Sequence, residues 1–392
     1  MPHTDLIPAA APPPADALGL ASTLRARTAV DPGADPKTVA DALLDQLRRD
    51  RLIWAVAPIE RGGLGLGLAD AARVTVRLAK TSGSLGLIYA MHLSQALSLL
   101  RHGAGSPYLT AFTDRLIRDQ ALVASGTSEK SLGGDILRSV CAVEAGPDGA
   151  LQVVKESPNI SYMDHAQAVL VTAMRAEAKG RPTQVVIAAE TARMELRPGR
   201  DARMMGMQGI LNRPYAFTAH FGPEAIFADP HPVIARETMT PSIHVLWAAL
   251  WSGLASHALG KAKAFLTKEA GHGEGAELMW AELSRLANRH YQMNALIREA
   301  ARDFDEPPAS ADPAMALART ARVKRLKIVC SEVLQDVCQG ALGLIGLRGY
   351  AEDGPYSLSE VIRDALSARV MISNYRLLLN NGAIERFVED EL

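Results

Sequence analysis

The spacing of apolar residues in the middle of this 392-residue chain differs from that in both flanks, and this difference constrains the fold more than any other feature. Between about Ala121 and Pro232, short apolar runs such as AVLVTAM and TQVVIAAE are separated by Gly, Pro, Asn and Asp, which is typical of strands and turns. Before and after this region, apolar residues recur at helical spacing. The order helices, strands, helices shows no alternating βαβ units and therefore predicts an α+β fold.

The same pattern predicts where the domains begin and end. Residues 1–15 are rich in Pro and Ala and are expected to form a disordered tail. We expect an N-terminal helical domain over residues 16–120, a middle β domain over 121–232 and a C-terminal four-helix bundle over 233–392. In the last part, Leu283, Leu286 and Met293 lie on one apolar stripe of a long helix, as the core of such a bundle requires.

Composition excludes several partners. Lys and Arg total 42 and Asp and Glu 43, so the formal net charge of −1 gives no basic excess that would favour nucleic acid or an anionic membrane surface. The apolar segments Leu85–Leu100 and Ile243–Leu259 contain polar residues and are short for a membrane span, so we expect buried helices. Three scattered cysteines fit neither a disulfide framework nor a metal site, which favours a reduced, cytoplasmic protein without a metal.

Short segments along the chain carry a resemblance to a known family. In chain order they are PIERGGLG at residues 58–65, TSEKSLGGD at 127–135, NIS at 159–161, and GLRGY at 346–350 followed by RDA at 363–365. They resemble, respectively, the loop between early helices, T-E-P-x-A-G-S-D, W-I-T, and G-G-x-G-Y with R-D-A of the acyl-CoA dehydrogenase superfamily. The resemblance covers most of the chain and implies an N-terminal helical domain, a middle β domain and a C-terminal four-helix bundle.

The resemblance also implies a cofactor, because members of this family hold FAD between the β domain and the C-terminal helices. The cofactor-binding positions that it implies carry small hydroxyl, amide or glycine residues: Ser125, Thr127, Ser128, Asn159, Ser161, Gly346 and Asn374. It further implies Gly134 as a substrate contact. The alternative is that the hydroxyl groups satisfy local backbone groups of turns and strands.

The catalytic base is where this chain departs from the family. The usual Glu, a few residues after R-D-A, is replaced by Ile372, and the other known base position, on the first C-terminal helix, falls on His244. His244 could accept a proton near neutral pH or could be a polar cap at a helix start. His92 is a second catalytic candidate, because related flavin monooxygenases use histidines near the flavin; its alternative is a hydrogen-bonded core residue.

A second departure concerns cofactor anchoring. The Arg that reaches the FAD pyrophosphate in the family is Glu269 here, so we expect weaker flavin binding. A run of basic residues could compensate, although such runs usually form a solvated face: Arg319, Arg322, Lys324, Arg325 and Lys327.

The resemblance leaves three functions open. The first is α,β-dehydrogenation of an acyl thioester, on CoA or a carrier, by an FAD enzyme with an electron-transfer partner. The motifs favour this function, because TSEKSLGGD and R-D-A resemble dehydrogenases more than the oxygenases of the same fold. The second is a monooxygenase that receives reduced flavin, FMN in that case, from a flavin reductase and uses O2. The third is a catalytically silent partner subunit or acyl-thioester binder. The resemblance further implies a homo-oligomer, with a homotetramer expected.

Overall fold

The computed structural model describes residues 35–132, 138–146, 149–176, 181–200, 202–270, 273–306 and 313–387. The tail predicted over residues 1–15 and the predicted substrate contact Gly134 lie outside the described residues.

Polar side chains fix the starts of the N-terminal helices. The helices are α2 (Pro36–Arg49), α3 (Leu68–Thr81), α4 (Gly83–His102) and α5 (Pro107–Arg118). Asp35 accepts hydrogen bonds from the backbone amides of the first turn of α2, and Ser82 and Ser106 do the same for α4 and α5. Such a cap satisfies amides that have no partner within the helix. Helix α4 is buried along most of its length and forms part of the core.

The middle of the chain forms two sheets, as its short apolar runs separated by turn residues predict. One sheet has the order β1-β4-β5 and the other β2-β3-β7-β6. The strands are β1 (Leu122–Gly126), β2 (Val143–Ala145), β3 (Leu151–Ile160), β4 (Ala166–Arg175), β5 (Thr183–Glu190), β6 (Met194–Pro198) and β7 (Arg213–Phe221). Strand β1 is parallel to β4, and the other pairings are antiparallel. Consecutive residues of β4 and β5 are buried, which explains their continuous apolar runs.

Long helices dominate the rest of the chain. They are α6 (His231–Ile234), α7 (Thr240–Phe265), α8 (Ala276–Asp305), α9 (Pro313–Ile345), α10 (Leu347–Tyr350), α11 (Ser359–Leu366) and α12 (Asn374–Ile384), with π-helical turns η9 (Ala235–Met239) and η10 (Leu266–Ala270). Helix α7 packs against α3, α4, α8 and α9. Leu283, Leu286 and Met293 of α8 are buried, so the predicted stripe is confirmed.

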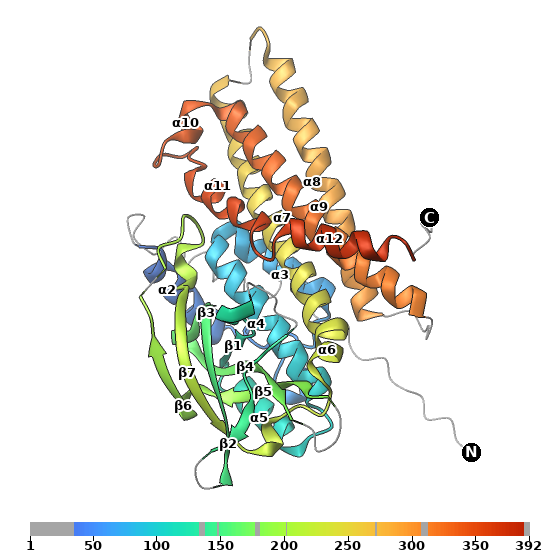
Figure 1. The fold of residues 1–392 in the computed structure, drawn as a ribbon. Helices are drawn as coiled ribbons and strands as arrows, with labels where there is room; N and C mark the ends of the chain where they lie inside the picture. The colour runs from blue at the N-terminus through green and yellow to red at the C-terminus, as the bar shows by residue number, and fades with distance from the viewer. Residues whose placement is uncertain are drawn as a thin grey trace, which may run out of the picture.

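Figure 1 shows how these parts are arranged. The sheets gather at one end of the molecule, α8 and α9 project at the other, and α3, α4 and α7 lie between them. Short 3₁₀ turns connect the elements: η2 (Ile59–Arg61), η3 (Lys130–Leu132), η5 (Met163–His165), η6 (Thr191–Arg193), η7 (Gln208–Ile210), η8 (Pro223–Ala225) and η11 (Ser367–Arg369). The end of β1, helices α4 and α7 and the turns after α11 lie close to one another.

Two helices of the described chain have the length and apolar character of a membrane span. They are α4, with 89% of the apolar window buried in the fold, and residues 315–345 of α9, with 50% buried. Burial inside the core explains the apolar character of α4. Helix α9 is half covered by its neighbours, and Leu317 and Val329 are on its exposed side.

Candidate functional site

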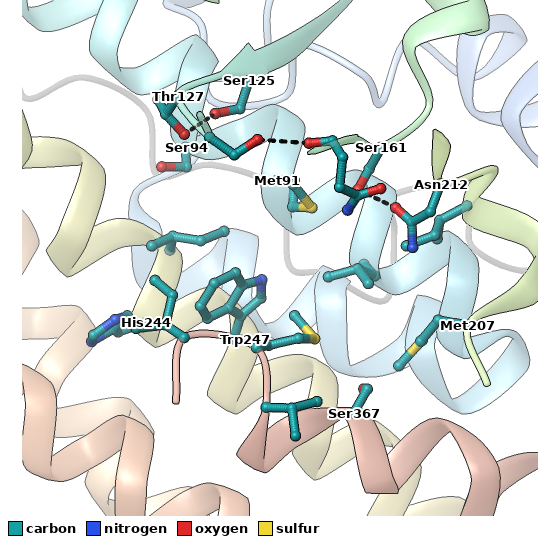
Figure 2. Close-up of a pocket in the computed structure, with 18 of the residues that line it drawn as sticks. Met91, Ser94, Ser125, Thr127, Ser161, Met207, Asn212, His244, Trp247 and Ser367 are labelled. Carbon is teal, nitrogen blue, oxygen red and sulfur yellow. Dashed lines mark hydrogen bonds between the residues drawn. The ribbon is translucent and has the colours of Figure 1, made fainter. Parts of the chain in front are cut away.

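A cavity of about 970 Å³ lies where the β domain meets α4, α7 and the turns after α11. Its volume is at the upper end of the range for small-molecule sites, so it has room for a multi-ring ligand. Figure 2 shows hydroxyl and amide side chains on one side of this cavity and Trp247 with apolar side chains on the other.

The β domain supplies the polar wall. Ser125 Oγ and Thr127 Oγ1 are 3.1 Å apart at the end of β1, and Ser128 Oγ donates to the Asn159 carbonyl oxygen at 2.8 Å. Ser161 Oγ donates to Asn212 Oδ1 at 2.7 Å (Figure 2). These residues lie together because β1 and β3 end at the same edge of the cavity. Five of the predicted cofactor residues thus share one wall.

The helical side supplies an apolar wall. Trp247 of α7 points into the cavity, and Ile243 and Ile372 line it as well. Six methionines, from helical segments, the loop before β7 and the turns after α11, add to the apolar surface of the cavity: Met91, Met204, Met205, Met207, Met239 and Met371. Methionine side chains are flexible and polarizable, so this wall can adapt to a flat or irregular apolar ligand.

The cavity carries no acid among its lining residues in the described part of the chain. Its titratable side chains are His231, His244, Arg363 and Arg376. Ile372, at the family's usual Glu position, contributes an apolar surface instead. Among the described residues, none that lines the cavity offers a carboxylate to accept a proton.

His244 lines the cavity, but its ring is engaged elsewhere. Its Nδ1 lies 3.1 Å from the carbonyl oxygen of Val323 on α9, and the ring stacks at 6.0 Å on Trp247. Burial lowers the pKa of His244 to about 4, so the imidazole is neutral at neutral pH. The interpretation of His244 as a helix cap is wrong, since it connects α7 to α9. In Figure 2 the ring points away from Ser161 and Asn212.

His92 does not belong to the cavity wall, which corrects its prediction as a catalytic group. Its Nε2 lies 3.0 Å from the Ile53 carbonyl oxygen, and its Nδ1 accepts from the Val123 amide at 3.1 Å. The ring is fully buried in edge contact with Trp54, and burial lowers its pKa to about 3. The alternative interpretation, a hydrogen-bonded core histidine, describes its position.

Two further predicted cofactor residues lie apart from the cavity wall. Gly346 is in the turn between α9 and α10, with a φ of 69°. Asn374 lies behind the wall, where its Oδ1 accepts from Lys327 Nζ at 2.6 Å and its Nδ2 donates to Ser331 Oγ at 2.9 Å. Within this chain, neither joins the hydroxyl cluster.

The basic residues of α9 are not all solvated, contrary to the sequence-based interpretation. The Lys327 side chain is completely buried, and its ammonium group donates to oxygens of the segment after α11. Glu269, at the position of the family's pyrophosphate Arg, forms an ion pair of 2.8 Å with Arg348.

Backbone strain concentrates around the cavity. Met207 and Ile372 line it with φ values of 54° and 52°, and Tyr162 and Leu211, at 44° and 50°, adjoin other wall residues. Non-glycine residues rarely adopt this left-handed conformation, and strained positions cluster at functional sites.

Sequence reasoning missed several residues of the site. Asn212 and Trp247 lie in no motif that the resemblance identifies, and the methionines are spread over α4, the loop before β7, η9 and the C-terminal turns. Only the tertiary fold brings them together, so no local signal could have identified them.

Comparison with known proteins gives the same family as the motifs. The family model described as "Acyl-CoA dehydrogenase, C-terminal domain" matches residues 244–372. Isovaleryl-CoA dehydrogenase, mitochondrial, of Oryza sativa subsp. japonica is 33% identical over 89 residues, a match that spans only 22% of this chain and 22% of that protein.

Solved structures share the fold over almost the whole chain. Butyryl-CoA dehydrogenase from Megasphaera elsdenii superposes with a TM-score of 0.77 at 18% identity, covering 94% of this chain and 98% of that one. TdsC from Paenibacillus sp. A11-2, in complex with FMN and indole, gives 0.80 at 19% identity, covering 94% and 96%. TdsC is a dibenzothiophene monooxygenase.

The architecture of helices, two sheets and a helical bundle is thus that of acyl-CoA dehydrogenase-like proteins. The match of residues 244–372 to the acyl-CoA dehydrogenase C-terminal model and the shared fold of the whole chain confirm the resemblance carried by its motifs.

Proposed function

We propose that this protein is a flavin-dependent oxidoreductase that holds the isoalloxazine ring of FAD or FMN in the central cavity. Such a ring requires hydrogen bonds along its polar edge and apolar cover over its faces. The observation that carries the proposal is the division of the cavity into a hydroxyl and amide wall, including Ser125, Ser161 and Asn212, and an apolar wall around Trp247.

Polar atoms without partners support the fit. Asn159 Oδ1 and Trp247 Nε1 are buried and have no hydrogen-bond partner in the described structure, although both residues belong to the cavity wall. An unsatisfied buried polar group costs about 1–3 kcal/mol. A ligand that carries both donors and acceptors, as an isoalloxazine ring does, suits such a wall.

The residues of the cavity favour monooxygenation over dehydrogenation. A bound flavin supplies hydride and electron transfer and, when reduced, reactivity toward O2. The side chains of this chain orient the ring and exclude water, but none of the described residues that line the cavity carries a carboxylate to take an α-proton. We therefore place the oxygenase, supplied with reduced flavin by a reductase, before the dehydrogenase that the motifs alone favoured.

Acyl-thioester dehydrogenation is the second candidate, because the C-terminal match is to an acyl-CoA dehydrogenase model. It requires His244 as the base. With Nδ1 donating to Val323, the Nε2 atom is the unprotonated nitrogen that could accept the proton. The direction of the ring away from the polar wall argues against this role.

The proposal includes a cytoplasmic location and a homo-oligomeric state. The three cysteines are free, which fits a reducing cytoplasm. The exposed apolar surface of the C-terminal helices fits a homo-oligomer.

The experiment separates the two reactions on flavin-loaded protein. Without oxygen, a series of acyl-CoA thioesters should leave the visible band of oxidised flavin unchanged. With a flavin reductase, NAD(P)H and air, apolar aromatic compounds should gain oxygen, detected by mass spectrometry with labelled O2. Bleaching by an acyl-CoA without oxygen would support the dehydrogenase instead.

Two variants make the distinction sharper. A positioned base contributes about 10²–10⁴ in rate, so Ile372→Glu should create acyl-CoA bleaching only if the cavity accepts the thioester. Ile372→Gln, which has the same size without the charge, is the matched control. His244→Ala should leave oxygenation intact and should abolish any bleaching seen in the wild type.

A further inference from the structure

A buried lysine that has no acidic partner among the described residues lies directly behind the cavity wall. Lys327 Nζ donates to the Ala368 carbonyl at 2.9 Å, to the Ile372 carbonyl at 2.7 Å and to Asn374 Oδ1 at 2.6 Å. All three acceptors are neutral. The ammonium also lies 5.6 Å from the ring centre of Trp251.

Burial of the Lys327 ammonium costs free energy, so we expect the ammonium to stabilise the segment that it binds. Burial disfavours the charged form and lowers the pKa of Lys327 to about 8, and no ion pair with a carboxylate compensates in the described structure. The acceptors span residues 368–374, and Val370, Met371, Ile372 and Ser373 of this segment line the cavity. One side chain of α9 therefore connects the helical bundle to a whole section of the wall.

The segment contains a strained residue at its centre. Ile372 has a φ of 52°, which a β-branched side chain tolerates poorly. Its carbonyl group is one of the three acceptors of Lys327, and its side chain faces the cavity. An unsupported Ile in this conformation would relax toward negative φ and carry the neighbouring wall residues with it.

We propose that Lys327 is a positioning residue: its ammonium holds Ile372 in the left-handed conformation and so fixes the apolar wall at the place where relatives carry their base. The proposal rests on the proposed function only for the identity of the ligand, since the wall itself is a property of the chain. Lys327 acts through Ile372 and touches no ligand.

The first test compares hydrogen exchange in two lysine variants of α9. Lys327→Met removes the three donated hydrogen bonds, whereas Lys324→Met, one turn earlier, removes a half-buried lysine that makes none of them. In Lys327→Met, the amides of Met371 and Leu377, which bond Ser367 and Ser373, should exchange about tenfold faster, or roughly 1.4 kcal/mol of local opening. Lys324→Met should match the wild type.

The second test asks whether strain at Ile372 is what Lys327 offsets. Glycine adopts positive φ freely, so Ile372→Gly in the Lys327→Met background should return exchange in residues 367–377 to within about twofold of Ile372→Gly alone. A lysine that only stabilises the bundle would give additive effects spread over α9 and a lower melting temperature, with no rescue by glycine. That outcome overturns the proposal.

If Lys327→Met does not fold, Asn374→Ala provides the milder perturbation, because it removes one acceptor and keeps the lysine. Exchange should again rise in residues 367–377 and remain unchanged in α8. Hydrogen exchange is measured on the protein without flavin, and flavin binding is measured separately. If the variants do not change exchange but the wild type binds flavin, the role of Lys327 is overturned and the proposed function is not. If exchange changes as expected but the wild type binds no flavin, the proposed function is overturned and the role of Lys327 is not.

Discussion

Asp364 connects helix α11 to the loop before β7, whose Met204, Met205 and Met207 line the cavity. Its Oδ1 accepts a hydrogen bond from the Met207 amide, and the side chain is 4% exposed. Burial raises the pKa of this carboxyl from 3.8 to about 7. Near neutral pH the group therefore titrates behind the wall of the candidate site, where it contacts Met207 without lining the cavity.

Asp364→Asn should make the protein more stable at pH 8 than the wild type. Because the folded-state pKa is the higher one, the folded state holds a proton that the unfolded state releases, and wild-type stability falls as pH rises from about 4 to about 7. The difference reaches up to about 4 kcal/mol at pH 8, from roughly three pK units. Urea unfolding at pH 5 and pH 8 measures it.

The amide is a close control for shape, since Asn Oδ1 can accept from the same Met207 amide. Curves of stability against pH that run parallel for the two proteins would show that Asp364 does not titrate in this range.

At the scale of elements, α3 receives its N-terminal cap from a distant part of the chain. The carboxylate of Asp305, at the end of α8, accepts from the Leu68 amide at 2.7 Å and the Ala69 amide at 3.0 Å. The residue at the cap position itself is Gly67, which has no side chain to do this. A side chain of the bundle thus fixes the start of a helix in the N-terminal domain.

Asp305→Ala should lower the free energy of unfolding by about 1–2 kcal/mol, as the loss of a helix cap does. Chemical denaturation of the purified protein measures the change. Glu299→Ala, an exposed substitution on the same helix, should change it by less than about 0.5 kcal/mol. Equal losses in both variants would contradict the cap.

The elements could be predicted from the sequence where local pattern decides them. The runs AVLVTAM and TQVVIAAE became β4 and β5, and the apolar segment from Leu85 became the core helix α4, because period and burial agree there. Charge runs are a weaker guide. Lys327 belongs to a basic stretch of α9, and only the return of residues 368–374 against that helix explains its burial.

In the candidate site, too, some residues could be predicted from the sequence and others could not. Ser125, Thr127 and Ser161 were predictable from the family resemblance, and the structure places Ser125 near the end of β1 and Thr127 and Ser161 just beyond β1 and β3. His92 has the residue type of a catalytic group, but two backbone partners hold it in the core. Asn212 and Trp247 depend on how separate elements dock, which no local pattern encodes.

For the whole molecule, the exposed apolar surface of the C-terminal helices is the main unexplained feature. Tyr375, Leu378 and Leu379 of α12 are 71%, 52% and 59% exposed, and Phe387 beyond the helix is 70% exposed. A contiguous apolar surface of this kind is typical of an interface. We expect a second copy of the chain to cover it.

Sedimentation velocity of the purified protein should give a dimer or larger assembly. Leu379→Glu places a charge on this surface and should shift the protein toward monomer, whereas Arg197→Glu, at an exposed position of β6 among the sheets and away from α12 (Figure 1), should not. A wild-type protein that sediments only as a 41.9 kDa monomer contradicts this expectation.

The central claim is that the cavity binds a flavin between its hydroxyl wall and Trp247. The most direct measurement is equilibrium titration of the flavin-free protein with FAD and with FMN, oxidised and reduced, followed by flavin fluorescence or calorimetry. We expect saturable binding of one flavin per chain, weakened about three- to tenfold by Ser161→Ala and unchanged by the remote Ser106→Ala. Absence of saturable binding for every flavin form, in a protein that is folded by circular dichroism, would contradict the claim.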